Sequence, residues 1–402
     1  MKWPGNGTLS ATCAGGAEPY LEEELRSIGL RPLIRENGVV HFSGGFPEIV
    51  MANNLLRTAS RILLPLISGS VDGYDDLYRL SRTLDWATII RPEQSLRVSG
   101  VTRSRTIADS SFAAVRIKDA ITDSQRAKAR KRSSVSRKDP DVGITFFVSD
   151  RQAHISLDSS GRPLHERGYR VEAGSAPLRE TLAATVLNAA GWNSATLLFD
   201  PFCGSGTIAI EAALLAARIS PGDLRTGFAF QRWCFAEQPR TSPANESPEN
   251  DRTEDAPQAP IIASDSDPDA VAIARRNAER AGVSHLITFR VADATAMAPF
   301  DTPGLVVTNP PYGERLQSHD IQTLMSAFGR SAKAALPGWR ICFLSEGKTG
   351  AKSIGLRTRL VAELWNGGIQ TNLYGTEIYS PRAGRQTQRE GISTVGNQQE
   401  EP

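Results

Sequence analysis

The sequence predicts an α/β protein in which a doubly wound, mostly parallel sheet with one antiparallel strand follows a smaller α+β module. From residue 196 onward, short apolar runs alternate with stretches of helical periodicity, the pattern of parallel strands joined by crossover helices. Residues 1–160 instead mix short β-like runs and helices without this regular alternation. With 402 residues, the chain is long enough for two or three domains, each with its own core.

In the N-terminal part, the periodicity of apolar residues predicts both helices and strands. Apolar residues at helical spacing predict three helices, at residues 20–28, 46–64 (ending near Pro65) and 110–122. Runs of β-like composition predict strands at residues 143–148 and 153–157. These elements suit a mixed module rather than a regular α/β sheet.

In the C-terminal part, short apolar runs predict the strands of the parallel sheet, at residues 196–199, 261–264, 287–291, 305–308 and 340–344. Helical stretches follow at residues 207–218, 268–281 and 320–336. The run at residues 373–379 predicts a late, antiparallel strand. This order of elements is the basis for the doubly wound sheet.

Two segments have the composition of disordered chain. Residues 237–260 hold six acidic residues, two basic residues and five prolines, with few apolar groups. Such a segment cannot bury enough surface to offset the entropy lost on ordering, so we expect a disordered insert. The tail at residues 381–402 is rich in Gln, Glu, Gly and Arg and is expected to be disordered as well.

The overall composition excludes several classes of protein. Hydrophobic residues make up 40% and charged residues 22%, which is ordinary for a soluble globular protein. We see no apolar run long enough to span a bilayer and no signal peptide at the start. The four cysteines are scattered without metal-ligand spacing, which argues against a zinc site or a disulfide framework. We therefore expect a cytoplasmic protein without a metal.

Positive charge is concentrated in one segment. Residues 101–140 contain eleven Lys and Arg against four Asp and Glu, and the densest part runs from Arg126 to Lys138. A cluster of this kind suits a polyanion, because each neutralised phosphate releases condensed counterions. The composition fits a solvated basic loop equally well.

A glycine turn follows the first predicted strand of the C-terminal part. Residues 200–209 (DPFCGSGTIA) fit the pattern G-x-G-x-x-A, with Gly204, Gly206 and Ala209 at the small positions. The glycines let backbone approach a ligand, and the N-terminus of the next helix offers unpaired N–H groups to negative charge. This suits a dinucleotide pyrophosphate or the carboxylate of S-adenosylmethionine. Asp200 favours S-adenosylmethionine, because a carboxylate can meet the ammonium group of that cofactor.

Further acidic residues extend this predicted cofactor site. The carboxylate that binds a ribose usually lies about 20 residues beyond the glycines. Here it is delayed to Asp265, because the insert at residues 237–260 falls between elements. Asp267 is either an alternative ribose ligand or the N-cap of the next helix. Asp293, after the third strand, is expected to accept a hydrogen bond from the adenine amine.

Residues 309–312 (Asn-Pro-Pro-Tyr) follow the fourth strand and predict a catalytic loop. The lone pair of an aromatic amine is delocalised, so a methylating site must hold both N–H groups and stabilise the developing charge. The Asn309 side-chain oxygen and the Pro310 carbonyl can supply two acceptors, while the prolines fix the loop. Tyr312 can stack on a base turned out of its helix. The predicted chemistry is methyl transfer to an exocyclic base amine.

These motifs resemble those of the THUMP-domain guanine-N2 methyltransferases. Residues 200–207 and 309–316 (NPPYGERL) are similar to the two signatures of that family. Residues 164–170 (LHERGYR) and 176–184 (APLRETLAA) are similar to its bridge between an RNA-binding and a catalytic half. The resemblance covers about residues 8 to 380. It points most closely to the bacterial enzymes that make N2-methylguanosine in 23S ribosomal RNA.

The resemblance implies a Rossmann-like class I methyltransferase domain at residues 161–380, behind a ferredoxin-like domain at 1–65 and a THUMP domain at 66–160. Implied cofactor contacts are Asp200, Gly204, Gly206, Asp265 and Asp293. The target amine is implied to lie at Asn309 and Pro310, with Tyr312 against the guanine. For the basic cluster it implies RNA contact through Arg126, Lys128, Arg130, Lys131 and Arg132.

The leading hypothesis is methyl transfer from S-adenosylmethionine to guanine N2 in 23S ribosomal RNA or its assembly intermediate. A tRNA guanine-N2 enzyme is a close alternative, since THUMP modules serve both substrates. An adenine-N6 enzyme could use the same Asn-Pro-Pro-Tyr loop, because it too must hold an aromatic amine. The continuation at residues 313–315 and the THUMP-like half count against it. A non-catalytic assembly factor would be expected to show erosion of the glycine turn or of the catalytic loop, and neither is seen.

Overall fold

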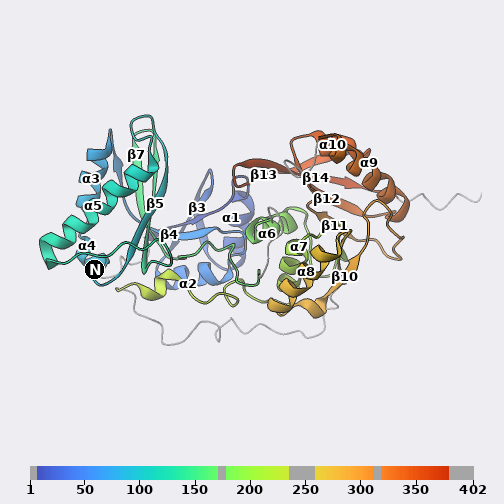
Figure 1. Ribbon diagram of the computed structural model, residues 1–402, viewed down its shortest axis with the longest axis horizontal. Helices are drawn as coiled ribbons and strands as arrows, with labels where there is room; N and C mark the ends of the chain where they lie inside the picture. Colours follow the sequence, from blue (N-terminus) through green and yellow to red (C-terminus); the bar gives the residue numbers. More distant parts are fainter. Residues whose placement is uncertain (1–6, 171–177, 235–258, 312–317, 380–402) are drawn as a thin grey trace, which may run out of the picture.

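The computed structural model describes residues 7–170, 178–234, 259–311 and 318–379, which form two seven-stranded sheets at the two ends of an elongated molecule (Figure 1). All of the predicted insert except residues 259–260, and the whole predicted tail, lie outside these ranges. The N-terminal sheet lies on the left in Figure 1 and the C-terminal sheet on the right.

The first sheet is mixed and contains strands from two regions, the predicted ferredoxin-like region at 1–65 and the predicted THUMP region at 66–160. Its strand order is β2-β3-β1-β4-β7-β6-β5, and of these pairs only β5 and β6 are parallel. The strands are β1 (Gly7–Thr12), β2 (Arg31–Glu36), β3 (Val39–Gly44), β4 (Arg61–Ser70), β5 (Leu96–Arg103), β6 (Val142–Ser149) and β7 (Gln152–Asp158). Because β4 pairs with β1 on one side and β7 on the other, it joins the two regions in one continuous sheet.

The helices of this half are α1 (Glu18–Ser27), α2 (Phe46–Leu55), α3 (Tyr74–Arg82), α4 (Trp86–Ile89) and α5 (Ser110–Ala129). The predicted helix at residues 46–64 is wrong in its second part. The α2 helix ends at Leu55, and the apolar run that follows Arg61 belongs to strand β4. A short apolar run cannot be assigned to helix or strand by its periodicity. Pro65 is exposed and lies at a register shift in the β4–β7 pairing, where a missing N–H is tolerated.

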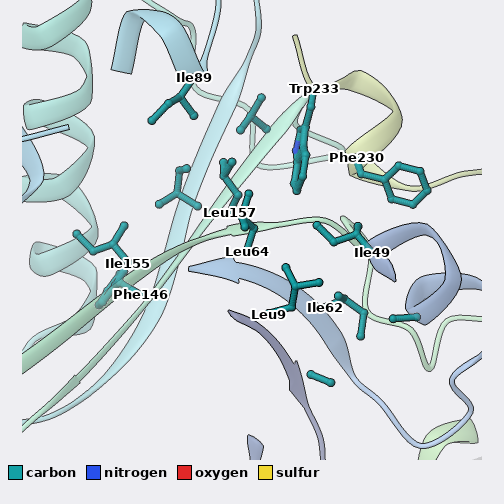
Figure 2. Close-up of a cluster of buried hydrophobic side chains, with 14 of the residues drawn as sticks. Leu9, Ile49, Ile62, Leu64, Ile89, Phe146, Ile155, Leu157, Phe230 and Trp233 are labelled. Carbon is teal, nitrogen blue, oxygen red and sulfur yellow. The ribbon is translucent and has the colours of Figure 1, made fainter. Parts of the chain in front are cut away.

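The core of the N-terminal half includes residues that are distant in the sequence. Figure 2 shows Leu9, Ile62 and Leu157 in this cluster, together with Phe230 and Trp233. The last two come from the short 3-10 helix η1 (Ala229–Arg232) and the residue that follows it, well beyond the first half of the chain. Burying large aromatic side chains in the core of the other half anchors the two halves to one another.

The second sheet has the order β10-β9-β8-β11-β12-β14-β13. Its strands are β8 (Leu198–Asp200), β9 (Ile261–Asp265), β10 (Ile287–Val291), β11 (Leu305–Thr308), β12 (Arg340–Glu346), β13 (Arg359–Asn366) and β14 (Ile369–Glu377). Only β14 runs antiparallel to its neighbours, β12 and β13, and all other pairs are parallel. This confirms the predicted doubly wound sheet with one antiparallel strand. The β13 strand was not predicted.

Helices cover both faces of the second sheet. They are α6 (Glu180–Ala189), α7 (Thr207–Ala216), α8 (Pro268–Arg280), α9 (Ser318–Ala335) and α10 (Thr349–Ser353). Leu305 and Val307 of β11 pack in one apolar cluster with α6, α7 and α8, whereas Val306 packs in another with α9 and α10. Successive residues of a strand point to opposite faces, so a strand that is apolar throughout is buried between two helix layers.

A buried polar network lies where the two halves meet. Arg167 is 1% exposed, and its Nη2 donates to the carbonyl of Arg57 at 2.5 Å while its Nη1 donates to the carbonyl of Leu164 at 2.6 Å. Its Nε lies 3.7 Å from Oε1 of Glu211 on α7, which also accepts from the Tyr169 hydroxyl at 3.1 Å. Such a network fixes the position of the N-terminal half against the catalytic sheet, because breaking it would leave buried charge unpaired.

Candidate active site

A cavity of about 480 Å³ opens at the carboxyl ends of β8, β9, β10 and β11. Ligands of open α/β sheets bind at this edge, where the connections of neighbouring strands diverge. The residues that line it are Leu178, Asp200, Pro201, Phe202, Cys203, Gly204, Ser205, Thr207, Ile208, Asp265, Ser266, Asp267, Asp269, Ala270, Ile273, Asp293, Ala294, Asn309, Pro311 and Leu324. Of the five predicted cofactor residues, Gly206 is absent from this lining. The other four line the cavity together with Asn309.

The glycine turn connects β8 to α7, and its two glycines have different surroundings. Gly206 is the N-cap of α7 with φ of 83°, and a Cβ atom there would lie 2.9 Å from the Cβ of Ala274 on α8. Gly204 has φ of 51°, with open space around the position of its missing Cβ. Gly206 therefore allows helix packing, whereas Gly204 leaves the backbone open to the cavity.

Asp200 is the most deeply buried acid of the cavity, at 1% exposure. Its Oδ1 accepts a hydrogen bond from Thr308 Oγ1 at 2.6 Å and from the N–H of Phe202 at 3.3 Å. The pKa of Asp200 is raised to about 7, chiefly by burial and to a lesser degree by the charge of Asp265, although these two hydrogen bonds oppose the rise. The carboxyl group therefore titrates near neutral pH.

Asp265 is held at the end of β9 by two backbone hydrogen bonds. Its Oδ2 accepts from the N–H of Gly204 at 2.9 Å, and its Oδ1 accepts from the N–H of Asp267 at 3.1 Å. The side chain of Asp267 accepts from the N–H of Asp269 at 2.9 Å and is the N-cap of α8. Of the two alternatives for Asp267, the structure therefore contains the helix cap.

Asp293 lies in the exposed connection after β10. Its Oδ1 accepts from both the N–H and the hydroxyl of Thr295, each at 2.8 Å. Its Oδ2 has no partner within the described part of the chain. Asp293 thus closes a local turn with one oxygen and leaves the other available to a ligand.

Asn309 follows the last residue of β11 and lines the cavity. Its side-chain oxygen Oδ1 is buried and has no hydrogen-bond partner among the residues that the structure describes. Because a buried acceptor without a partner costs free energy, such an atom in a cavity marks a place for a donor from a ligand. Pro310 is buried and Pro311 lines the cavity, while Tyr312 lies outside the described residues.

The charge of the cavity distinguishes the two cofactors that the glycine turn allows. Its described lining residues include no Lys or Arg and five aspartates, Asp200, Asp265, Asp267, Asp269 and Asp293. A dinucleotide pyrophosphate would be repelled by this lining, whereas S-adenosylmethionine carries a cationic sulfonium and an ammonium group. The residues fit S-adenosylmethionine.

Arg170 supports the glycine turn, a role that the sequence motifs do not predict. Its guanidinium pairs with Glu180 at 2.9 Å and donates to the hydroxyls of Ser205 and Thr207, each at 3.1 Å. A further hydrogen bond of 3.0 Å reaches the carbonyl of Leu178. Arg170 is far from the glycines in the sequence, so its only signal was its place in the LHERGYR string.

The predicted RNA-binding residues lie at the C-terminal end of α5 and in the loop beyond it, in the N-terminal half. Arg126 and Lys128 are on the helix, and Arg130 is its left-handed C-cap with φ of 54°. All five predicted residues, Arg126, Lys128, Arg130, Lys131 and Arg132, are exposed. Three of them lie near carboxylates, since Arg126, Lys128 and Lys131 pair with Asp123, Asp85 and Glu93 respectively.

Comparison with known families identifies the chain along most of its length. A model of the RMKL-like methyltransferase domain matches residues 167–374, after an RlmL ferredoxin-like domain at 8–63 and a THUMP domain at 72–158. The chain belongs to the RMKL-like methyltransferase family. It is an S-adenosylmethionine-dependent methyltransferase with an N-terminal ferredoxin-like and THUMP module.

Two curated relatives and one solved structure illustrate the similarity. A Synechocystis protein described as "Putative RNA methyltransferase" is 34% identical over 376 residues, 92% of this chain and 96% of that protein. The ribosomal RNA large subunit methyltransferase K/L of Psychromonas ingrahamii is 37% identical over 92% of this chain, which spans 50% of that protein's length. The crystal structure of a "putative methyltransferase complexed with SAH" is 28% identical, with a TM-score of 0.81 and coverage of 96% and 100% of the two chains.

No described helix has the length and apolar character required to cross a membrane. Nor do the described His, Cys, Asp and Glu residues gather anywhere in a group of three or more that could hold a metal ion.

Proposed function

We propose that this RMKL-like methyltransferase transfers a methyl group from S-adenosylmethionine to the exocyclic N2 of a guanine in 23S ribosomal RNA, in the cytoplasm. The observation that carries the proposal is the Oδ1 of Asn309, which is buried and has no hydrogen-bond partner among the described residues, in a residue that lines the acidic cofactor cavity. The similarity to a ribosomal RNA large subunit methyltransferase supports the choice of ribosomal RNA. The THUMP domain and the exposed basic cluster support RNA as the substrate.

Residues around the glycine turn hold the cofactor in this proposal. S-adenosylmethionine, when bound, supplies a methyl group activated by its attachment to a cationic sulfur. Asp200 binds the ammonium group, Asp265 the ribose hydroxyls and Asp293 the adenine amine. Gly204 lets the backbone before α7 approach the cofactor carboxylate, and Gly206, the N-cap of α7, allows the close packing against α8 that holds this helix end in place.

The loop after β11 positions the guanine. Asn309 Oδ1 and the Pro310 carbonyl accept the two N–H groups of the target amine and direct its lone pair toward the methyl group. As the bond forms, the nitrogen becomes more positive, and these two oxygens stabilise that charge. Tyr312 stacks on the turned-out guanine. The amine's proton leaves to solvent after the transfer.

RNA is recognised in the other half of the molecule. Arg126, Lys128, Arg130, Lys131 and Arg132 are exposed on one helix end and its loop, and they contact phosphates. Phosphate contacts fix the position of the RNA without reading its sequence, so the target guanine is selected at the catalytic loop and by the shape of the RNA.

A gene deletion tests the proposal. Nucleosides from ribosomal RNA and tRNA of wild-type and deletion cells are separated and compared by mass spectrometry. We expect the amount of N2-methylguanosine in large-subunit ribosomal RNA to fall in the deletion cells. The wild-type gene should restore it, whereas Asn309→Ala should not. Asn188→Ala, which changes an exposed asparagine, serves as the control and should restore it as well. If N2-methylguanosine were lost only from tRNA, the substrate would be tRNA and not ribosomal RNA. If N6-methyladenosine were lost instead, the target base would be adenine and not guanine.

A further inference from the structure

A second cavity, of about 700 Å³, lies at the junction of the two halves. It is lined by residues 162 and 165–170, which follow the N-terminal sheet, by residues 178–180 and 224–227, and by Arg280 at the end of α8. Leu178 lines both this cavity and the cofactor cavity, so the two are neighbours. The six arginines that line it are Arg162, Arg167, Arg170, Arg179, Arg225 and Arg280, and we call it the arginine cavity.

Three of these arginines are structural. Arg167 belongs to the buried network described above, and Arg170 supports the glycine turn. Arg225 donates to four backbone carbonyls between residues 160 and 166, and its guanidinium carbon lies over the ring of Phe228, 5.1 Å from the ring centre. Their guanidinium groups form a fixed positive wall.

The other three arginines keep donors available to a ligand. Arg162 and Arg179 are exposed, and neither guanidinium has a hydrogen-bond or ion-pair partner among the described residues. Arg280 is exposed and donates through Nε to the carbonyl of Gly168 at 3.0 Å, which leaves its two terminal nitrogens free within the described part of the chain. A guanidinium fork matches the geometry of two phosphate oxygens.

The charges of the arginines add to the effect of burial on the pKa values of two neighbouring groups. Burial and then the charges of Arg179, Arg167, Arg61 and Arg170 lower the pKa of His165 to about 4, so this ring is neutral at pH 7. Burial and the charge of Arg167, with a smaller effect of Arg162, lower the pKa of Arg225 to about 10. Among the described lining residues there are two acids, Glu166 and Glu180. Glu180 is paired with Arg170, so within that part of the chain Glu166 alone opposes the remaining arginines.

We propose that the arginine cavity binds backbone phosphates of the substrate RNA, through Arg162, Arg179 and Arg280, next to the nucleotide that enters the cofactor cavity. The inference rests on the proposed function only in that the substrate is RNA. The position favours RNA, because the cavity is lined by residues that follow the THUMP-matched region and by residues of the methyltransferase domain, and because it shares Leu178 with the cofactor cavity. A strand held here would be anchored beside the point where its target base leaves the stack.

The test measures binding of a fluorescein-labelled 20-nucleotide oligouridylate by anisotropy over a range of salt concentrations. This probe has no guanine, so its binding is independent of guanine-N2 activity. The variant is Arg162→Ala/Arg179→Ala, and the matched control is Arg357→Ala/Arg359→Ala, which removes two exposed arginines near the start of β13. A third variant, Arg162→Lys/Arg179→Lys, keeps the charge without the fork.

We expect the alanine variant to raise the Kd about tenfold at 0.1 M salt and to flatten the slope of log K against log salt by about 1.4, since each phosphate contact on a single strand contributes about 0.7. The lysine variant should keep the wild-type slope, and the control should keep both values. Calorimetry with S-adenosylhomocysteine should give equal cofactor affinity for all variants, which shows that they are folded.

A slope and Kd equal to those of the control, or no measurable wild-type binding, would overturn the inference. Displacement of the oligonucleotide by 1 mM orthophosphate at constant ionic strength would assign the cavity to a small free anion and would overturn it as well. If the expected slopes are found while no guanine is methylated, the proposed function fails and this inference stands.

Discussion

Thr308 Oγ1 donates a hydrogen bond of 2.6 Å to Oδ1 of Asp200, and both residues are fully buried. This contact joins the end of β11, directly before Asn309, to the end of β8, directly before the glycine turn. The residue proposed to bind the cofactor's ammonium group is thereby coupled to the strand that carries the catalytic loop. The next three predictions concern Asp200 or its hydrogen bond from Thr308.

Cofactor affinity should depend on pH through Asp200. Because its pKa lies at about 7, the carboxyl is mostly protonated at pH 6 and ionised at pH 8. Binding an ammonium group requires the ionised form, so affinity for S-adenosylmethionine should fall about tenfold from pH 8 to pH 6. Calorimetry across this range measures it. Asp200→Asn should bind weakly and lack this dependence, whereas Asp269→Asn, an exposed aspartate of the same cavity, should keep it.

The raised pKa of Asp200 should also make the free energy of unfolding decrease as pH rises. The native pKa of Asp200 is raised from 3.8 to about 7, so between these values the native state holds a proton that the unfolded state has lost. The free energy of unfolding therefore decreases as pH rises from about 4 to about 7 through this group. Urea titrations at several pH values should show a smaller decrease in Asp200→Asn. Equal pH profiles for the two proteins would show that Asp200 has an ordinary pKa.

Removing the Thr308 hydroxyl should move the pH dependence upward. The hydrogen bond from Thr308 favours the ionised carboxyl, so Thr308→Val raises the pKa of Asp200 further and weakens cofactor binding at pH 7. The midpoint of the affinity profile should rise above that of the wild type. The exposed Thr288 of β10 offers a matched Thr→Val control that should leave the midpoint in place. An unchanged midpoint in Thr308→Val would remove the role given to this pair.

Asn309→Ala should separate chemistry from cofactor binding. It removes the only side-chain oxygen proposed to hold the target amine, so single-turnover methyl transfer should slow by about 10²-fold or more. Affinity for S-adenosylmethionine should remain within a factor of about two, and Asn188→Ala should match the wild type in both measurements. Activity near the wild-type rate would show that Asn309 does not position the amine.

The two glycines of the cofactor turn should respond differently to alanine. Both have positive φ, so each substitution strains the backbone by roughly 1–2 kcal/mol. Only at Gly206 would the new Cβ also collide with another helix, at 2.9 Å from Ala274. Gly206→Ala should therefore unfold at a lower temperature than Gly204→Ala in thermal scans. The reverse order would mean that α7 and α8 do not pack as closely as described.

Neutralising Arg130, Lys131 and Arg132 together should weaken RNA binding and flatten its salt dependence. These three side chains lie at and beyond the C-terminal end of α5, where they are exposed. The measurement is anisotropy with a ribosomal RNA transcript at several salt concentrations. Three exposed basic residues of another surface, Arg330, Lys348 and Lys352, provide a control of equal charge. If the slope of log K against log salt were unchanged, these three residues would not contact RNA, and the cluster would be a solvated loop.

Local signals predicted the catalytic sheet and its motifs well. The strands β8 to β12 and the antiparallel β14 were predicted because apolar runs, glycine turns and polar residues at strand ends are all local features. The helix expected at residues 46–64 is wrong from residue 56 onward, because the periodicity of a short apolar run does not distinguish helix from strand. The pairing of β4 with β1 and β7 is what makes this run a strand.

Other features depend on contacts between distant residues. Phe230 and Trp233 complete the core of the N-terminal half, and Arg170 donates hydrogen bonds to the glycine turn from a distant part of the sequence. Their residue types give no sign of these partners. The arginine cavity is likewise invisible in the sequence, because Arg162, Arg179 and Arg280 come together only through the fold.

The most direct test of the proposed activity is methyl transfer in vitro with S-adenosylmethionine that carries a deuterated methyl group. The acceptor is ribosomal RNA from cells that lack the gene, and its nucleosides are identified by mass spectrometry after digestion. The account predicts label in N2-methylguanosine of large-subunit RNA with the wild-type protein and about 10²-fold less with Asn309→Ala. Label in N6-methyladenosine, or equal labelling by the two proteins, would contradict it.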